Sequence, residues 1–234
     1  MSEFVTNWWQ VYSSEPVLFS LGLTAKICLY ALALQLLAGI PLACYLAGAQ
    51  TPGRAITESL VTFPLIFPPI ATGYLLLVVL GRMSPLGGFL NDQLGIEIVF
   101  SFPGIVIAAF IAGLPLVVKP VQAAIKTFGN DLVEASYTLG RGRLLTFCHV
   151  TLPGIKKSIF SGLALGLGRS LGEVGITLML GGNIIGKTNT LSLEVFNAVY
   201  DGDFERATAL CLLLFGFSLL LFASIRKLSS DTPG

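Results

Sequence analysis

Long apolar runs separated by short polar links dominate this sequence. The first run covers residues 18–47 and has a continuous apolar core from Ile27 onward. About 20 apolar residues in an α-helix are enough to cross the roughly 30 Å hydrocarbon core of a bilayer. Four further runs are candidate spans, at residues 59–80, 103–118, 159–180 and 207–225. The pattern predicts an all-α, polytopic membrane protein with five transmembrane helices, and six as the alternative.

The polar links between these runs have different predicted structures. Residues 48–57 contain a Thr-Pro-Gly-Arg sequence that is typical of a turn. Residues 81–102 predict a loop with one short helix, and residues 181–206 predict a polar loop. Within the first span, we expect Pro41 to kink the lower end of the helix.

Proline interrupts the second candidate span. Pro64, Pro68 and Pro69 all fall in its first half. Each proline frees a backbone carbonyl, which inside a membrane must face protein or a water-lined cavity. We therefore expect Pro68, Pro69 and nearby Thr72 to line a translocation path. Thr72, like Gln35, can also hydrogen-bond to a neighbouring helix without any role in transport.

The composition excludes several classes of protein. With 54% hydrophobic and 12% charged residues and a mean hydropathy of +0.82, the chain of 234 residues is too apolar for a soluble domain. A net charge of +1 without a basic and aromatic stripe gives no indication of nucleic-acid binding. Four cysteines lie in or beside apolar runs without metal-like spacing, so we interpret them as small hydrophobic residues: Cys28, Cys44, Cys148 and Cys211.

Lysine and arginine are concentrated on one side of the predicted spans. The opposite side has Arg82, Lys187 and Arg206, against eight acidic residues. Positively charged loops mark the cytoplasmic side of a membrane. We therefore expect the N-terminus outside, and the segment around Glu134 and the C-terminus in the cytoplasm, in a cell (inner) membrane. The nine basic residues on the predicted cytoplasmic side are Arg54, Lys119, Lys126, Arg141, Arg143, Lys156, Lys157, Arg226 and Lys227.

This topology divides the chain into three parts. Residues 1–16, with Trp8 and Trp9 suited to the headgroup level of the membrane, form an external interfacial segment. Residues 17–227 form the transmembrane domain. Residues 228–234 form a short cytoplasmic tail.

Two opposite charges interrupt the fourth run. Arg169 and Glu173 are four residues apart, so on a helix they share one face and can pair. A charge at mid-span costs roughly 2.5–3.5 kcal/mol on insertion scales, so both must face protein or water. They form either a structural ion pair at a helix interface or part of an anion path. In the second case Arg169 supplies positive potential and Glu173 holds its geometry, and Ser170 belongs to the same path.

Glycines surround this charged pair. Two Gly-x-x-x-Gly spacings predict that helices approach closely there. Five helices leave little room for a lumen within one chain, so a homodimer meeting at such a surface would make a central pathway, although any tight bundle would also fit these glycines. The glycines are Gly162, Gly166, Gly168, Gly172 and Gly175.

Enzymatic sites are not indicated. Residues 181–188 match the phosphate-loop letters, but that loop needs a preceding strand and a following helix, which membrane spans do not provide. His149 is the single histidine and lies outside the spans, away from a buried serine such as Ser170. The sequence has no HExxH motif and no cluster of Asp, His and Cys residues for a metal.

The longest polar-flanked passage lies at residues 134–153. It predicts a short amphipathic helix followed by a Gly-Arg-Gly-Arg turn. The apolar side of this helix consists of Leu132, Val133, Tyr137 and Leu139. Gly140 can end that helix in the left-handed conformation and allow another backbone to approach. A cytoplasmic segment of this shape is suited to docking, although an ordinary amphipathic loop helix would have a similar pattern.

The spacing of this passage is Glu-Ala-Ser, three residues, Gly, nine residues, Val, one residue, Leu-Pro. It resembles the EAA loop of ABC-transporter permeases, with Ser136 in place of the usual Ala and Val150 in place of the usual Ile. The resemblance implies a coupling loop at residues 127–153, inside an ABC transmembrane type-1 domain, that contacts the ATP-hydrolysing subunit. The implied coupling residues are Glu134, Ala135, Ser136, Leu139, Gly140, Arg141, Leu152 and Pro153.

Beyond the loop, residues 63–87 and 167–184 resemble the molybdate, tungstate and sulfate group of permeases. Within this group, the proline-rich second span and residues 186–207 look most like molybdate permeases. The resemblance implies a type I ABC importer with two copies of this chain, two cytoplasmic ATPase subunits and an external oxyanion-binding protein. ATP and Mg²⁺ would be bound by the ATPase, with no cofactor and no ATPase site in this chain. Import of tungstate or of sulfate or thiosulfate is the alternative. A stand-alone carrier or channel is a different class, and the internal repeats common in carriers are not found here.

Overall fold

The computed structural model describes residues 8–230. Residues 1–7 of the predicted N-terminal segment and residues 231–234 of the predicted tail lie outside this part. The described part contains helices and no strand, which confirms the all-α fold class. The elements in chain order are α2 (Glu15–Leu34), η1 (Gln35–Gly39), α3 (Ile40–Ala47), α4 (Pro52–Ile66), α5 (Pro69–Leu80), α6 (Pro85–Leu94), α7 (Phe102–Thr127), α8 (Asn130–Thr138), α9 (Arg143–Thr146), η2 (Phe147–Thr151), α10 (Leu152–Gly154), α11 (Lys156–Leu171), α12 (Gly175–Gly181), α13 (Leu191–Tyr200) and α14 (Phe204–Ser230).

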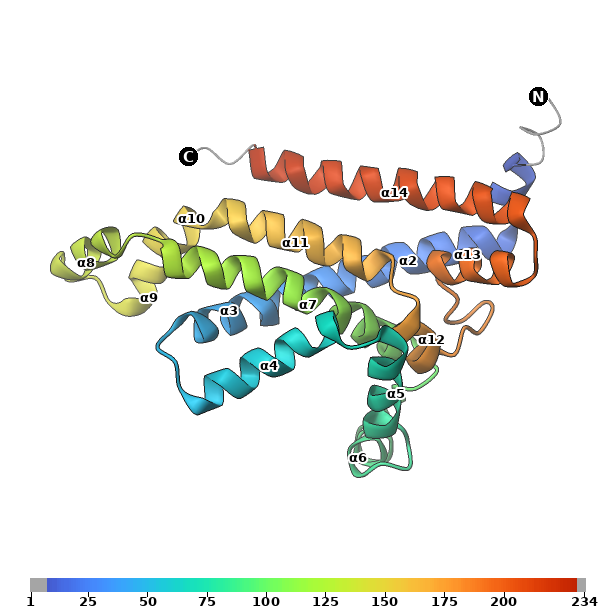
Figure 1. The fold of residues 1–234 in the computed structure, drawn as a ribbon, viewed down its shortest axis with the longest axis horizontal. Helices are drawn as coiled ribbons and strands as arrows, with labels where there is room; N and C mark the ends of the chain where they lie inside the picture. The colour runs from blue at the N-terminus through green and yellow to red at the C-terminus, as the bar shows by residue number, and fades with distance from the viewer. Residues whose placement is uncertain (1–7, 231–234) are drawn as a thin grey trace.

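The long helices form a bundle around α7. Figure 1 shows α2, α7, α11 and α14 extending along the longest axis of the molecule, and α7 packs against α2, α3, α4 and α11. At one end of the bundle α8 and α9 project beyond it, and the turn between α3 and α4 lies towards the same end (Figure 1). At the opposite end lie α12, α13 and the start of α2. Segments that the sequence predicts to share a side of the membrane therefore lie at one end of the molecule.

Three helical stretches are long and apolar enough to cross a membrane by themselves. They are Glu15–Ala47, Phe102–Thr127 and Phe204–Ile225. Two bent pairs bring the number to as many as five in the described residues: α5 with α6, bent by 57°, and α11 with α12, bent by 59°. The upper value agrees with the predicted five spans. The second span, however, covers other residues than the predicted 59–80, and the fourth consists of two helices.

The second span was wrongly predicted as one helix over residues 59–80. The chain leaves helical geometry at Phe67, with ψ 145°, and at Pro68, with ψ 130°, so α4 and α5 are separate. The physical reason is the Pro68-Pro69 pair, because a residue that precedes proline is driven out of the α region. Pro64, by contrast, is accommodated inside α4.

The central helix α7 is longer than the predicted third span, which ended at residue 118. It continues to Thr127 and includes both Pro115 and Pro120. Packed neighbours hold a membrane helix together through prolines that would end a helix in water. Val117 and Val118, between the two prolines, are fully buried against other helices.

The first span includes a π-helical segment, Gln35–Gly39, which ends two residues before Pro41. A π-helical turn inside an α-helix marks a local widening of the backbone. The departure from α geometry thus lies next to the predicted kink at Pro41.

The two longer loops gave opposite outcomes. The short helix predicted within residues 81–102 is confirmed by α6. Residues 181–206, predicted as a polar loop, contain α13, whose Leu191 and Leu193 are fully buried. The prediction was wrong because the polar residues of this helix obscured its apolar stripe. Its start signal is Thr190, whose hydroxyl accepts a hydrogen bond from the Leu193 N–H at 3.3 Å.

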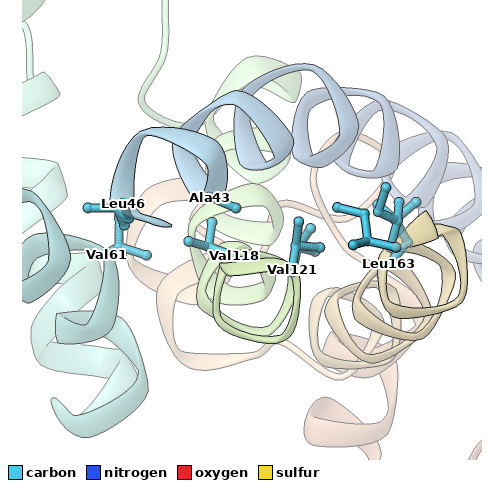
Figure 2. Close-up of a cluster of buried hydrophobic side chains, with 9 residues drawn as sticks. Ala43, Leu46, Val61, Val118, Val121 and Leu163 are labelled. Atoms are coloured by element: carbon cyan, nitrogen blue, oxygen red, sulfur yellow. The ribbon is translucent and has the colours of Figure 1, made fainter. Parts of the chain in front are cut away.

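A packed cluster ties four helices together near the end of the bundle that bears α8 and α9. Figure 2 shows side chains from α3, α4, α7 and α11 meeting around Val118 and Val121. In a bilayer such contacts stabilise through close packing more than through removal from water. The cluster consists of Ala43, Leu46, Val61, Val117, Val118, Val121, Ile155, Ile159 and Leu163.

Candidate functional site

The projecting segment begins with α8, which ends as the sequence predicted. Gly140 has φ +79°, a left-handed conformation that favours glycine. The Gly140 N–H donates to the Tyr137 carbonyl at 2.9 Å, and the Arg141 N–H donates to the Ser136 carbonyl at 3.2 Å. These two bonds form a Schellman motif, which satisfies the last carbonyls of the helix and reverses the chain.

The returning limb of the segment is helical and is tied to α8. It consists of α9, η2 and α10. Ser136 and Thr146 are both buried, and their hydroxyl groups form a hydrogen bond of 2.9 Å. The sequence had singled out Ser136, but Thr146 was missed because its spacing from Ser136 has no motif of its own.

Both ends of the segment are anchored to the bundle. Phe128 precedes α8 and Leu152 begins α10, and both pack against the cluster shown in Figure 2. A Cβ at Gly154 would collide with the ring of Phe128. The two ends of the segment are therefore held on the same core, to which α7 and α11 both contribute.

Between these anchors the segment presents an unusual surface. Leu139 and Leu144 are 80% and 77% exposed at the tip of a projection. Glu134, Ala135 and Arg141 are also exposed. Large apolar side chains grouped with charges on a projection are typical of a protein interaction site. The structure thus places the exposed predicted coupling residues on one projection, while Ser136 and Leu152 hold it together.

The predicted path residues lie at two helix breaks that meet. One break separates α4 from α5 at Pro68, and the other separates α11 from α12 after Leu171. A Cβ at Gly175 would lie 2.8 Å from the Cβ of Pro69 and 2.9 Å from the backbone nitrogen of Ile70. The two short helices α5 and α12 therefore pack backbone against backbone at their starts.

Arg169 and Glu173 form the predicted ion pair. They do so across the break and not on one continuous helix, because α11 ends at Leu171. The Glu173 side chain is 1% exposed, and its Oε1 accepts a hydrogen bond of 2.7 Å from the Ile176 N–H at the start of α12. Arg169 is 30% exposed on its side chain. Glu173 thus fixes the start of α12, while Arg169 keeps part of its guanidinium group accessible.

Ser170 and Thr72 are buried, unlike the partly exposed Arg169. The Ser170 hydroxyl donates to the Ala109 carbonyl at 2.6 Å and accepts from the Gln35 side-chain amide at 2.9 Å. Thr72 is also buried, and its hydroxyl donates to the Pro68 carbonyl at 3.3 Å. Gln35 therefore bonds to a neighbouring helix, as predicted, whereas Thr72 bonds within its own chain segment.

The glycines around the charged pair are largely used inside the chain. A Cβ at Gly162 or Gly166 would meet α7, and one at Gly175 would meet α5. Among the described residues, a Cβ built at Gly168 would have no neighbour within 4 Å apart from the adjoining residues and the backbone of its own helix. Of the two interpretations, a tight bundle within one chain accounts for Gly162, Gly166 and Gly175, so these three do not form a surface between two copies.

The segment with phosphate-loop letters is a turn that follows a helix, α12, and not a strand. The Thr188 hydroxyl donates to the Gly181 carbonyl at 2.7 Å and accepts from the Ile184 N–H at 2.9 Å, which closes the turn on itself. Beyond it, the buried Glu194 pairs with Arg206 at 2.8 Å. This pair joins α13 to α14, and the sequence did not predict it.

The fold and the projecting segment define a polytopic helical membrane protein with a projection that is anchored to the bundle at both ends. Residues 39–231 match the family described as "Binding-protein-dependent transport system inner membrane component". The chain belongs to this family of permease subunits of ABC transporters, and it is a multi-pass membrane protein.

Two curated relatives and one solved structure illustrate the likeness. The molybdenum transport system permease protein ModB of Escherichia coli (strain K12) is 34% identical over 94% of this chain and 96% of its own length. The sulfate transport system permease protein CysT of the same strain is 30% identical over 96% of this chain and 80% of its length. A bacterial alginate ABC transporter in complex with an alginate-bound periplasmic protein has a chain with a TM-score of 0.75 at 18% identity, covering 94% of this chain and 80% of that chain. This last likeness shows the type I importer fold.

Proposed function

We propose that this chain is the membrane-spanning subunit of an ATP-driven importer that moves an oxyanion, molybdate, into the cytoplasm. The observation on which this depends most is the closed projection formed by α8, α9 and α10. Its apolar and charged side chains face outward at residues 134–145, while Phe128 and Leu152 fix its ends to the bundle core. A segment with this construction can receive motion from a separate subunit and pass it to the helices at both ends.

The proposed energy source is a pair of cytoplasmic ATPase subunits that bind ATP and Mg²⁺. In this proposal ATP is hydrolysed by the partner subunits, and this chain has no ATPase site of its own. When the ATPase subunits close, the projection moves with them, and α7 and α11 tilt between outward- and inward-facing arrangements. Binding energy from ATP is thereby used at a distance from the transported anion.

The proposed assembly has two copies of this chain and an external oxyanion-binding protein. One chain offers five spans at most in its described part, which supports a pathway shared between two copies. In this assembly the N-terminus is outside, and the projection and the C-terminus are cytoplasmic. The grouping of the projection with the α3–α4 turn at one end of the bundle supports that orientation (Figure 1).

The proposed path passes the two helix breaks. Proline at positions 68 and 69 leaves backbone groups without helical partners there, and Arg169 supplies positive charge. A partly exposed guanidinium group held by Glu173 is suited to a passing dianion.

Molybdate is proposed as the substrate over sulfate and tungstate because of the relatives. Identity to the molybdenum permease is higher and covers more of the relative than identity to the sulfate permease. Sulfate import is the second candidate, and the similarity to CysT supports it.

The test begins with co-purification in mild detergent, where ATPase subunits should accompany the chain. Purification of the chain alone in every condition would instead indicate a carrier or channel. The complex, reconstituted with its binding protein, should then accumulate labelled molybdate only with ATP. Competition by tungstate and by sulfate ranks the anions, and stronger inhibition by sulfate than by unlabelled molybdate would overturn the choice of substrate.

A further inference from the structure

A cavity of about 410 Å³ lies where α5 ends and α6 begins, at the side of the bundle away from the projection. Its walls come from Leu77 and Leu80 of α5, from the segment at residues 96–100, and from Lys187 in the turn after α12. Three separate parts of the chain thus enclose one space. None of the predicted path residues lines it.

Two positive side chains that are far apart in the sequence line this cavity, Arg82 and Lys187. Both are exposed, and within residues 8–230 neither takes part in a salt bridge. The third basic residue of the predicted outer side, Arg206, differs because it is paired with buried Glu194. The fold therefore brings Arg82 and Lys187 to the same place.

The surroundings strengthen the field of these cations. Much of the cavity wall is apolar, including Leu77, Leu80 and Ile98. Low-dielectric walls focus the field of like charges and raise the local concentration of oppositely charged solutes. A space of this size holds a tetrahedral oxyanion together with several waters, since each water takes roughly 30 Å³.

We propose that this cavity is an external anion site, in which Arg82 and Lys187 receive the oxyanion between the binding protein and the membrane path. The site rests on the proposed oxyanion import. A tetrahedral dianion matches it, because the guanidinium and ammonium groups donate hydrogen bonds and contribute positive charge.

Glu97 also lines the cavity, and its carboxylate opposes an anion. A transit site must bind strongly enough to collect its ligand and weakly enough to release it. Glu97 therefore limits the affinity of the site. Neutralising Glu97 and neutralising either cation should therefore have opposite effects on anion binding, which makes the proposal testable.

The first experiment measures binding without transport. The purified complex with its ATPase subunits is treated with a water-soluble acylating reagent, with and without inorganic molybdate, and acylation of Lys187 is followed by mass spectrometry. Molybdate should slow acylation of Lys187 several-fold, leave acylation of exposed Lys26 unchanged, and have no effect on Lys187 in Arg82→Gln. Equal acylation of Lys187 with and without molybdate would overturn the proposal.

The second experiment measures initial uptake at limiting molybdate with the binding protein present. Arg82→Gln and Lys187→Gln should each lower the rate by about tenfold, as expected when focused charge is removed. Glu97→Gln should raise it, and Lys26→Gln should leave it unchanged. A decrease in all three cavity variants would indicate a structural role and contradict the proposal.

Three other outcomes can be told apart. If Arg82→Gln and Lys187→Gln weaken the affinity of the binding protein for the permease while molybdate gives no protection, the surface docks the binding protein and the anion site is wrong. If the unaltered complex imports neither molybdate, tungstate nor sulfate, the proposed function fails. If it imports and all variants match it, only the anion site fails.

Discussion

The hydroxyl groups of Ser136 and Thr146 form a buried hydrogen bond of 2.9 Å between α8 and α9. The bond crosses the turn that Gly140 makes, so the two limbs of the projection are fastened together near their tip as well as at their anchored ends. A projection that transmits force must move as a unit. The position that departs from the family's usual alanine is thus part of an internal tie.

Replacing Ser136 with alanine should loosen this projection. The change leaves the buried Thr146 hydroxyl without its partner, which costs about 1–3 kcal/mol. We expect Ser136→Ala to lower the number of anions imported per ATP hydrolysed, measured by parallel uptake and phosphate-release assays. The double variant with Thr146→Val removes both polar groups and should recover most of the loss. Equal coupling in Ser136→Ala and the unaltered protein would show that the tie is not needed.

The exposed carboxylate of Glu134 gives a second prediction. Because its side chain is exposed, Glu134→Lys should leave the fold and membrane insertion intact. Reversing the charge at the proposed contact with the ATPase should uncouple uptake from hydrolysis, so that ATP is hydrolysed while molybdate uptake falls. Asp201→Lys, a charge reversal at an exposed acid beyond α13, is the matched control and should transport normally. Normal uptake by Glu134→Lys would argue against docking through this helix.

The sequence predicted features that depend on local chemistry. The left-handed turn at Gly140 follows from the ability of glycine to adopt positive φ, and the short helix within residues 81–102 was predicted from the turn residues around it. The Arg169–Glu173 pair was also correctly predicted, because four-residue spacing keeps two side chains close even where the helix ends.

Features that depend on long-range packing could not be predicted in the same way. The continuation of α7 through Pro115 and Pro120 depends on neighbours that only the folded bundle supplies. Likewise, the sequence could not show whether the glycines face another helix of the same chain or a second copy. The meeting of Pro69 with Gly175 joins two breaks that no local pattern connects.

Close packing at Gly113 gives a third prediction. A Cβ there would meet the Gln35 side-chain amide and the Gly166 carbonyl, and would lie 2.6 Å from the Ser170 hydroxyl. Gly113→Ala should therefore destabilise the bundle by about 1–3 kcal/mol, the usual cost of overpacking. Gly168→Ala is the matched control, since the space beside it is open within the described residues. Thermal unfolding in detergent should show a lower midpoint for the first variant and no change for the second. Equal midpoints would contradict the packing of α7 against α11 and η1.

The two interpretations of Arg169 and Glu173 can be separated by a double variant. Arg169→Met alone leaves the buried Glu173 carboxylate without its ion pair, and such a loss typically costs about 3–5 kcal/mol. Adding Glu173→Gln removes the uncompensated charge and keeps an oxygen that can accept the Ile176 N–H, so thermal stability should return towards that of the unaltered protein. If the pair only stabilises the break between α11 and α12, molybdate uptake should return with it. We expect uptake to stay low in the stable double variant, because Arg169 is partly exposed and its positive charge serves the passing anion in the proposed function. Recovery of both properties would assign the pair a structural role alone.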